Sequence, residues 1–155
     1  MKNAILILLG LYAGGAWAGH DEFTPSAAAA KDPAHAAWRE ECGSCHVAYP
    51  PQLLPAASWR QLMANLERHF GTDASLDPAR RQVLLDHALR HAGRQRVDPA
   101  APLSISKSPW FVHEHDELGA AVWRRPAVKS PANCQACHSR AEQGDFGERG
   151  IRVPR

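Results

Sequence analysis

Apolar residues recur at helical spacing through most of the chain, and no segment shows the sustained alternation that is typical of a β-strand. Asp-Pro or Ser-Pro occurs four times before such a segment, and each pair favours a helix start because its first residue can cap the helix and proline suits the first turn. The pattern therefore predicts an all-α protein. The expected helices run from Asp32 into the first cysteine motif, over 59–70 with Ser58 as cap and Gly71 as stop, over 77–92 before Gly93, over 110–118 before Gly119, and from Ser130 into the second cysteine motif.

Helical phase separates buried from exposed positions in two of these segments. The apolar face of 59–70 contains Trp59, Leu62, Met63, Leu66 and Phe70, and that of 77–92 contains Leu84, Leu85, Ala88, Leu89 and Ala92. Met63 is therefore expected in the core. His87 falls on the polar side of its helix and His91 at the edge, so both are expected at the surface.

The N-terminus has the pattern of a secretory signal. Lys2 precedes a short apolar stretch, and Ala16-Trp17-Ala18 has the small-x-small pattern of a cleavage site. A bilayer-spanning helix needs about 20 apolar residues, so a cleaved signal is favoured over a retained membrane anchor. We expect signal residues 1–18, cleavage near Ala18, a periplasmic mature chain and a flexible segment over 19–31.

Composition limits what the mature chain can be. The 155 residues carry 18 basic and 16 acidic side chains, which lacks the concentrated positive charge of a nucleic-acid binder. Twelve prolines and eleven glycines indicate many loops, among them 49–55 and the connector 94–107. A short, loop-rich chain has little core of its own, so it is expected to fold poorly without a cofactor.

All four cysteines lie in two copies of Cys-x-x-Cys-His, the attachment motif of c-type haem. Cys42 and Cys45 in the first copy, and Cys134 and Cys137 in the second, have the spacing to bind the two vinyl groups of one porphyrin. His46 and His138 then follow as iron ligands. Two covalent haem c groups are predicted, in haem domains over 32–95 and 96–155. Zinc bound by the paired thiols and a disulfide framework are poorer interpretations, because a histidine follows both pairs and each disulfide would close a very small loop.

The second axial ligand of each iron decides the chemistry, because methionine, histidine or an open position gives different potentials and reactivity. Only Met63 remains after signal cleavage, so at most one iron can have methionine. Among the other histidines, His115 shares an apolar face with Phe111, whereas His113 points to the opposite side. His69 ends its helix beside Gly71, where its ring can turn into a cleft.

Spacing suggests how these ligands pair. His69 lies 23 residues after His46, and His115 lies 23 residues before His138. Each interval is long enough to wrap one haem and reach its iron from the opposite side. The expected pairs are therefore His46/His69 and His115/His138, and a crossed arrangement stays open. His20, in the N-terminal segment, and His35, in the helix of the first motif, are less suitable.

Many linked segments make the mature chain similar to the dihaem cytochrome c family of the DHC type. They are Cys42 to His46 followed by Ala48-Tyr49-Pro50-Pro51 and Leu53-Leu54-Pro55, Ser58-Trp59, His69-Phe70-Gly71, Ala74-Ser75-Leu76, Trp110-Phe111, Glu114-His115, Ala132 to His138, and Ala141 to Phe146. The resemblance implies a periplasmic electron carrier with two bis-histidine haems. It also implies an N-terminal part like a small class I cytochrome c and a less regular C-terminal part.

The resemblance further implies two redox partners, a b-type membrane cytochrome and an oxygen-binding monohaem cytochrome c. Six-coordinate irons favour outer-sphere electron transfer, so the expected protein is a carrier and not an enzyme. The alternative is a gas- or peroxide-reactive dihaem enzyme with one labile distal ligand. The arginines around 80–96 form either a basic docking patch or, as the simpler interpretation, a solvated helix face.

Overall fold

The computed structural model describes residues 31–94 and 103–155. Within these ranges the protein is built from helices and turns without a β-strand, so the predicted all-α class is correct. No helix there is long and apolar enough to cross a bilayer. The expected signal (1–18), nearly all of the segment 19–31, and the boundary expected between residues 95 and 96 lie outside the described residues.

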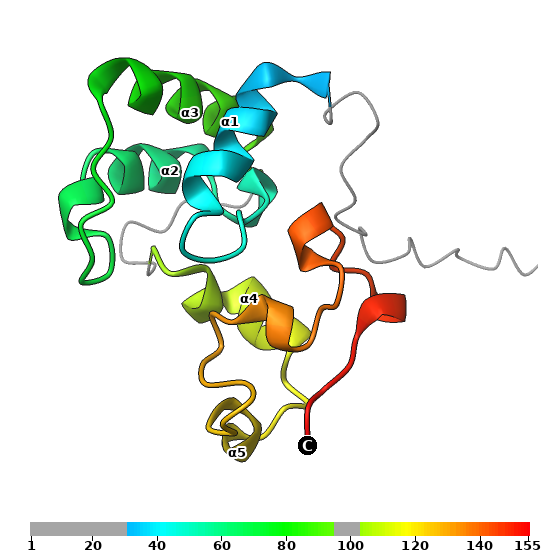
Figure 1. Cartoon of the computed structure of the whole chain (residues 1–155). Coiled ribbons are helices and arrows are strands. Elements are labelled where there is room, and N and C mark those ends of the chain that lie inside the picture. The colour runs from blue at the N-terminus through cyan, green and yellow to red at the C-terminus, as the bar shows by residue number, and fades with distance from the viewer. Residues whose placement is uncertain (1–30, 95–102) are drawn as a thin grey trace, which may run out of the picture.

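Three helices form the N-terminal part: α1 (Pro33–Cys42), α2 (Ala56–Met63) and α3 (Pro78–His91). Two of their starts are confirmed. The Asp32 carboxylate accepts the Ala34 N–H at 2.9 Å, and the Asp77 carboxylate accepts the Arg80 N–H at 2.9 Å, so both aspartates cap their helices. Figure 1 shows the three helices grouped at one end of the molecule, with the helices and turns of the C-terminal part at the other end.

The core lies between these three helices. Trp38 of α1 meets Trp59 of α2 edge to face, with ring centres 5.2 Å apart, and Leu84 of α3 is fully buried beside them. Met63 belongs to this core, as its helical phase predicted. Ile105, from the other side of the undescribed segment, packs into the same core, so the two parts of the chain share apolar contacts.

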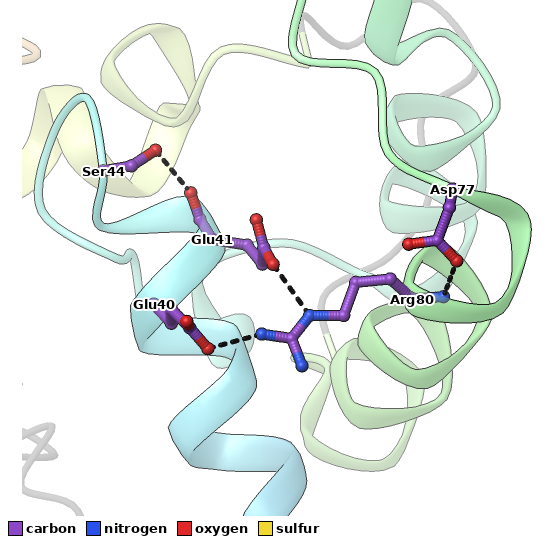
Figure 2. Close-up of polar contacts among 5 residues, drawn as sticks. All are labelled: Glu40, Glu41, Ser44, Asp77 and Arg80. Carbon is purple, nitrogen blue, oxygen red and sulfur yellow. Dashed lines mark hydrogen bonds and ion pairs between the residues drawn. The ribbon is translucent and has the colours of Figure 1, made fainter.

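Helices α1 and α3 run antiparallel, and polar contacts hold them at both ends. Near the start of α3, Arg80 donates to Glu41 at 2.8 Å and to Glu40, as Figure 2 shows. Near its end, His87 approaches Asp32, the cap of α1. Arg80 is therefore paired within the fold, so it is unsuited to the free basic patch considered from the sequence.

The expected helix over 59–70 is wrong at both ends. α2 already begins at Ala56, after Pro55, and it ends at Met63. The Asn65 side chain donates to the Gln61 carbonyl at 2.8 Å, which is the acceptor that the next helical amide would use. The chain continues as a short 3-10 helix, η3 (Leu66–Arg68), which delivers His69 at its end.

The C-terminal part is less regular and contains two short helices, α4 (Pro109–Glu114) and α5 (Ala120–Trp123). Ser108 caps α4 as predicted, accepting the Phe111 N–H at 3.1 Å. The expected extension to residue 118 is wrong. The His115 ring donates a hydrogen bond to the Phe111 carbonyl at 2.9 Å, and in a continuing helix the His115 amide would donate to that carbonyl. Gly119, the expected helix stop, is instead the N-cap residue of the unforeseen α5. Further 3-10 helices are η2 (Pro51–Leu53), η4 (Ile105–Lys107), η5 (Cys134–Ala136), η6 (Ala141–Gln143) and η7 (Glu148–Gly150).

The helix expected from Ser130 through the second motif is also wrong. Lys129 adopts a φ of 70°, and the Ser130 hydroxyl accepts the Ala132 N–H at 3.2 Å. The Asn133 side chain donates to the Val128 carbonyl at 2.9 Å. These side chains satisfy backbone groups that a helix would use, so only the η5 turn forms.

The placement of His87 at the surface is wrong as well, since it is only 2% exposed. α3 packs against α2 on its predicted apolar face and also against α1, whose Trp38 and His35 rings lie 5.6 and 5.5 Å from the His87 ring. A helix covered from two sides buries a wider arc than its apolar stripe, and His87 lies within that arc.

Leu84 and Val83 give a matched test of this core. Leu84 is 0% exposed and Val83 is 44% exposed on the same helix. We expect Leu84→Ala to lower the free energy of unfolding by about 2–5 kcal/mol because it leaves a cavity. Val83→Ala should change it by less than about 0.5 kcal/mol. Urea denaturation of the haem-loaded protein measures both, and equal losses would contradict this packing.

Candidate haem sites

The first site begins where α1 ends. Cys42 is the last residue of α1, and Cys45 and His46 lie in the turn that follows. Burial, and next the Glu41 charge, raise the pKa of the Cys42 thiol to about 12. No disulfide joins the four cysteines, all of which lie within the described residues.

The His46 ring is oriented by its neighbours. Its Nδ1 lies 2.7 Å from the Val47 carbonyl, and its face stacks on Tyr49 with ring centres 4.8 Å apart. If Nδ1 carries the proton to that carbonyl, Nε2 keeps a lone pair for a metal. The loop over 49–55 therefore supports this histidine, a role of Tyr49 that sequence reasoning missed.

His69 faces His46 from the other side. The two ring centres lie 6.2 Å apart, and the ring planes are inclined by only 22°. A sharp turn allows this approach, because Phe70 and Gly71 have φ angles of 50° and 94°, in the region that glycine adopts readily. Burial, and next the neighbouring His46, lower the pKa of His69, so its imidazole tends to be neutral, the form that binds metals.

The second site is built from turns and the end of α4. The η5 turn carries Cys134, and the His138 amide donates back to the Cys134 carbonyl at 2.8 Å. His115 follows α4, and its Nδ1–H donates to the Phe111 carbonyl while its ring stacks on Phe111 with centres 4.1 Å apart. The hydrogen bond from His115 to the Phe111 carbonyl, which ends α4, therefore also fixes the orientation of the His115 ring. From the sequence, Phe111 was predicted only to share an apolar helix face with His115, and its role in orienting that ring was not predicted.

His115 and His138 also face each other, with ring centres 6.2 Å apart and planes inclined by 70°. Burial, and next His115, lower the pKa of His138. The structure thus brings together the two pairs that the sequence spacing suggested. His113 is exposed, as expected, and lies in neither pair.

The separation of each pair fits a metal held between the rings. An imidazole nitrogen lies about 2 Å from a bound metal and the ring centre about 1 Å further, so two opposed rings have centres about 6 Å apart. In addition, Nδ1 of both His69 and His138 is buried without a hydrogen-bond partner. These residues fit two haem groups, with the cysteines as the covalent anchors.

Polar contacts connect the two sites. The Tyr49 hydroxyl donates to the Ala132 carbonyl at 2.7 Å, and Arg39 donates to the Glu142 carbonyl at 2.8 Å. An open cavity of about 290 Å³ is lined by Cys45 and His46 of the first motif and by Gln135 of the second. The two motif loops are therefore neighbours in space although they lie far apart in the sequence.

A small all-α protein with two Cys-x-x-Cys-His motifs, each facing a distant histidine, has the features of a c-type cytochrome with two haems. The family described as dihaem cytochrome c matches residues 38–146, and the chain belongs to this family. It binds two c-type haems.

Solved structures agree with this assignment. A dihaem cytochrome c from Shewanella baltica is 39% identical, with a TM-score of 0.70 over 79% of this chain and 95% of its own. Two structures of the dihaem cytochrome c of Rhodobacter sphaeroides are 44% and 43% identical, with TM-scores of 0.63 and 0.65. Each covers 75% of this chain and 97% of its own. A comparison with curated proteins gives no match.

Separate substitution of the two distant histidines tests their role as ligands. We expect His69→Ala and His115→Ala each to remove the low-spin signal of one haem and to leave that of the other. His113→Ala, at an exposed histidine of α4, is the matched control and should keep both signals. Optical and electron paramagnetic resonance spectra of the haem-loaded variants provide the measurement, and an unchanged spectrum would reject the histidine concerned.

Proposed function

We propose that this cytochrome is a periplasmic electron carrier in which two bis-histidine sites exchange single electrons with protein partners. Membership of the dihaem cytochrome c family supports a role as an electron-carrier cytochrome. The observation that carries the finer proposal is the 6.2 Å separation of the rings in each histidine pair. Bound haem c supplies reversible one-electron chemistry, at a potential that its axial ligands and surroundings adjust.

The protein residues contribute fixed orientation in this proposal. His46 and His115 each have Nδ1 against a backbone carbonyl, and a hydrogen bond of this kind holds the ring and its tautomer in place. The Tyr49 and Phe111 rings stack on these two imidazoles. Ligands already held in position need little rearrangement when the charge of the site changes, which suits rapid transfer.

A closed coordination sphere also separates this function from catalysis. If both histidines of a pair hold the haem iron, neither site would leave a position for oxygen, peroxide or another small ligand, so the chain is proposed not to be an enzyme. A gas- or peroxide-reactive protein would need one histidine of a pair to leave. In the first site, His69 is part of a tight turn, and the η3 helix and the Thr72 N–H hold that turn by backbone hydrogen bonds.

Location and partners rest on the sequence and on the family resemblance. The signal-like N-terminus supports export to the periplasm, where a membrane b-type cytochrome would be the donor and an oxygen-binding monohaem cytochrome c the acceptor. Phe70, which is 63% exposed and whose ring centre lies 4.9 Å from that of His69, offers an apolar contact beside the first site. We propose that this exposed ring takes part in a transient redox contact at the first site.

The closed coordination predicts the behaviour of the reduced protein. We expect both irons to be low-spin in both oxidation states and the reduced protein to bind no carbon monoxide without denaturant, because two histidines would hold each iron. Anaerobic redox titration with optical detection should give two one-electron steps. Rapid carbon monoxide binding, or turnover of peroxide by the untreated protein, would contradict the carrier function.

The partner proposal is tested with the purified acceptor. In a stopped-flow experiment, the reduced dihaem protein should transfer electrons to an oxygen-binding monohaem cytochrome c. Phe70→Ser should slow the second-order rate by about 10-fold, since it removes the apolar contact proposed beside the first site. Val112→Ser, at an exposed apolar residue of α4, is the matched control. No transfer by the unaltered protein, or equal rates for both variants, would reject this partner surface.

A further inference from the structure

A group of three potential metal ligands lies apart from both haem sites. Asp32, His87 and His91 each direct one donor atom into a common space, with all three atoms within 4.8 Å of one another. They lie at the end of α1 opposite to Cys42, and a helix of this length separates the two places by about 15 Å. The haem sites therefore do not account for this group.

Two helices place these residues together. His87 and His91 are four positions apart on α3, so they project from the same face with ring centres 4.8 Å apart. Asp32 comes from the antiparallel α1, where its Oδ1 accepts the Ala34 N–H as a helix cap. Its second oxygen, Oδ2, is directed to His87 Nδ1 at a distance of 3.6 Å.

His87 is the unusual member of the group. It is 2% exposed, yet neither of its ring nitrogens has a hydrogen-bond partner. Buried polar groups are almost always bonded, because leaving one unpaired costs about 1–3 kcal/mol. The 3.6 Å approach to Asp32 is too long for a hydrogen bond. A metal ion bound to one ring nitrogen of His87 would remove part of this cost, because that nitrogen would no longer be without a partner.

The charges of the group suit a cation. Burial, and next the electrostatic influence of His91 and His35, lower the pKa of His87 to about 4, so its imidazole is neutral at pH 7 and keeps a lone pair. The Ala34 N–H, as the largest influence, lowers the pKa of Asp32, so that residue is a carboxylate. The other groups that face His87 are His35, with ring centres 5.5 Å apart, and Arg90, whose guanidinium lies 3.9 Å from Asp32.

We propose that Asp32, His87 and His91 bind one divalent transition-metal ion of the zinc type, with water as the fourth ligand. Two imidazoles and one carboxylate are a common zinc donor set, and tetrahedral bonds of about 2 Å place the donors about 3.4 Å apart. Asp32 and His91 are only partly buried, so their side chains can turn inward to shorten the largest separation of 4.8 Å by about 1.4 Å.

Metal binding here would join the start of α1 to the end of α3. Arg80, Glu40 and Glu41 already join the opposite ends of the same two helices. The ion would complete this second connection, next to Trp38, whose ring lies 5.6 Å from that of His87. The inferred role of the ion is structural: it would link α1 to α3 and so stabilise the helices around the first haem site.

Zinc itself is the probe for the test. The haem-loaded protein, treated with a chelator and desalted, is titrated with zinc sulfate against a chromophoric chelator, and the retained metal is counted by mass spectrometry. We expect one zinc ion per chain, unchanged haem spectra, and a rise of about 5 °C in the unfolding midpoint. Failure to retain zinc at one ion per chain would overturn the proposal.

Two variants and a matched control locate the ion. Asp32→Asn keeps an oxygen that can cap α1 but removes the charge, and His91→Asn removes a partly exposed ligand, so neither opens the core as a substitution of His87 would. Each should weaken zinc binding at least about 10-fold. His113→Asn alters an exposed histidine and should leave binding unchanged. Undiminished binding in either ligand variant, or an equal loss in the control, would overturn the assignment.

Discussion

Two imidazole rings opposed across the width of one metal ion are the constraint on which this fold depends. The pairs His46/His69 and His115/His138 both have centres 6.2 Å apart, although their ring planes differ in inclination, 22° in one and 70° in the other. Several local features of the surrounding structure set this distance between the rings. The φ angles of Phe70 and Gly71 turn the chain after His69, and α4 stops where the His115 ring takes the Phe111 carbonyl. Ordering a chain with so few helices costs conformational entropy, and binding of the haem groups would offset that cost. The apoprotein is therefore expected to be poorly folded.

The two halves hold their sites in different ways. In the N-terminal part, α1, α2 and α3 enclose an apolar core, with Trp38, Trp59 and Leu84 at its centre, and the first motif projects from the end of α1. The C-terminal part has short helices and side-chain-capped turns, so its site depends on local hydrogen bonds such as those of Ser130 and Asn133. Tyr49 connects the halves, since it stacks on His46 and donates to Ala132. Contacts of this kind keep two redox sites close together in a small protein.

Helix starts were more predictable than helix ends. Asp32, Asp77 and Ser108 cap helices where the Asp-Pro and Ser-Pro pairs predicted them, because the capping side chain and the proline ring act within one turn. The ends of α2 and α4 were missed because Asn65 and His115 satisfy a backbone carbonyl with a side chain, a choice that depends on where those side chains are needed. The same limit explains Ser130, whose pair resembled a helix start but led only into turns. His87 was assigned to the surface because helical phase describes one covered face, whereas α3 is covered by both α1 and α2.

The sequence by itself determined the chemistry of this protein: two Cys-x-x-Cys-His motifs that use all four cysteines, Met63 as the one methionine besides Met1, and a family resemblance that the comparisons confirm. These features are local, because residues three or four positions apart are neighbours in any helix or turn. Tertiary structure decided between the pairing that the spacing suggested and the crossed arrangement that it left open, and it alone decided how the two motif loops meet and which histidine of α3 is buried against α1. Those outcomes depend on packing between segments far apart in the chain, where one helix covers another and a single turn directs a ring, and no local pattern records such contacts.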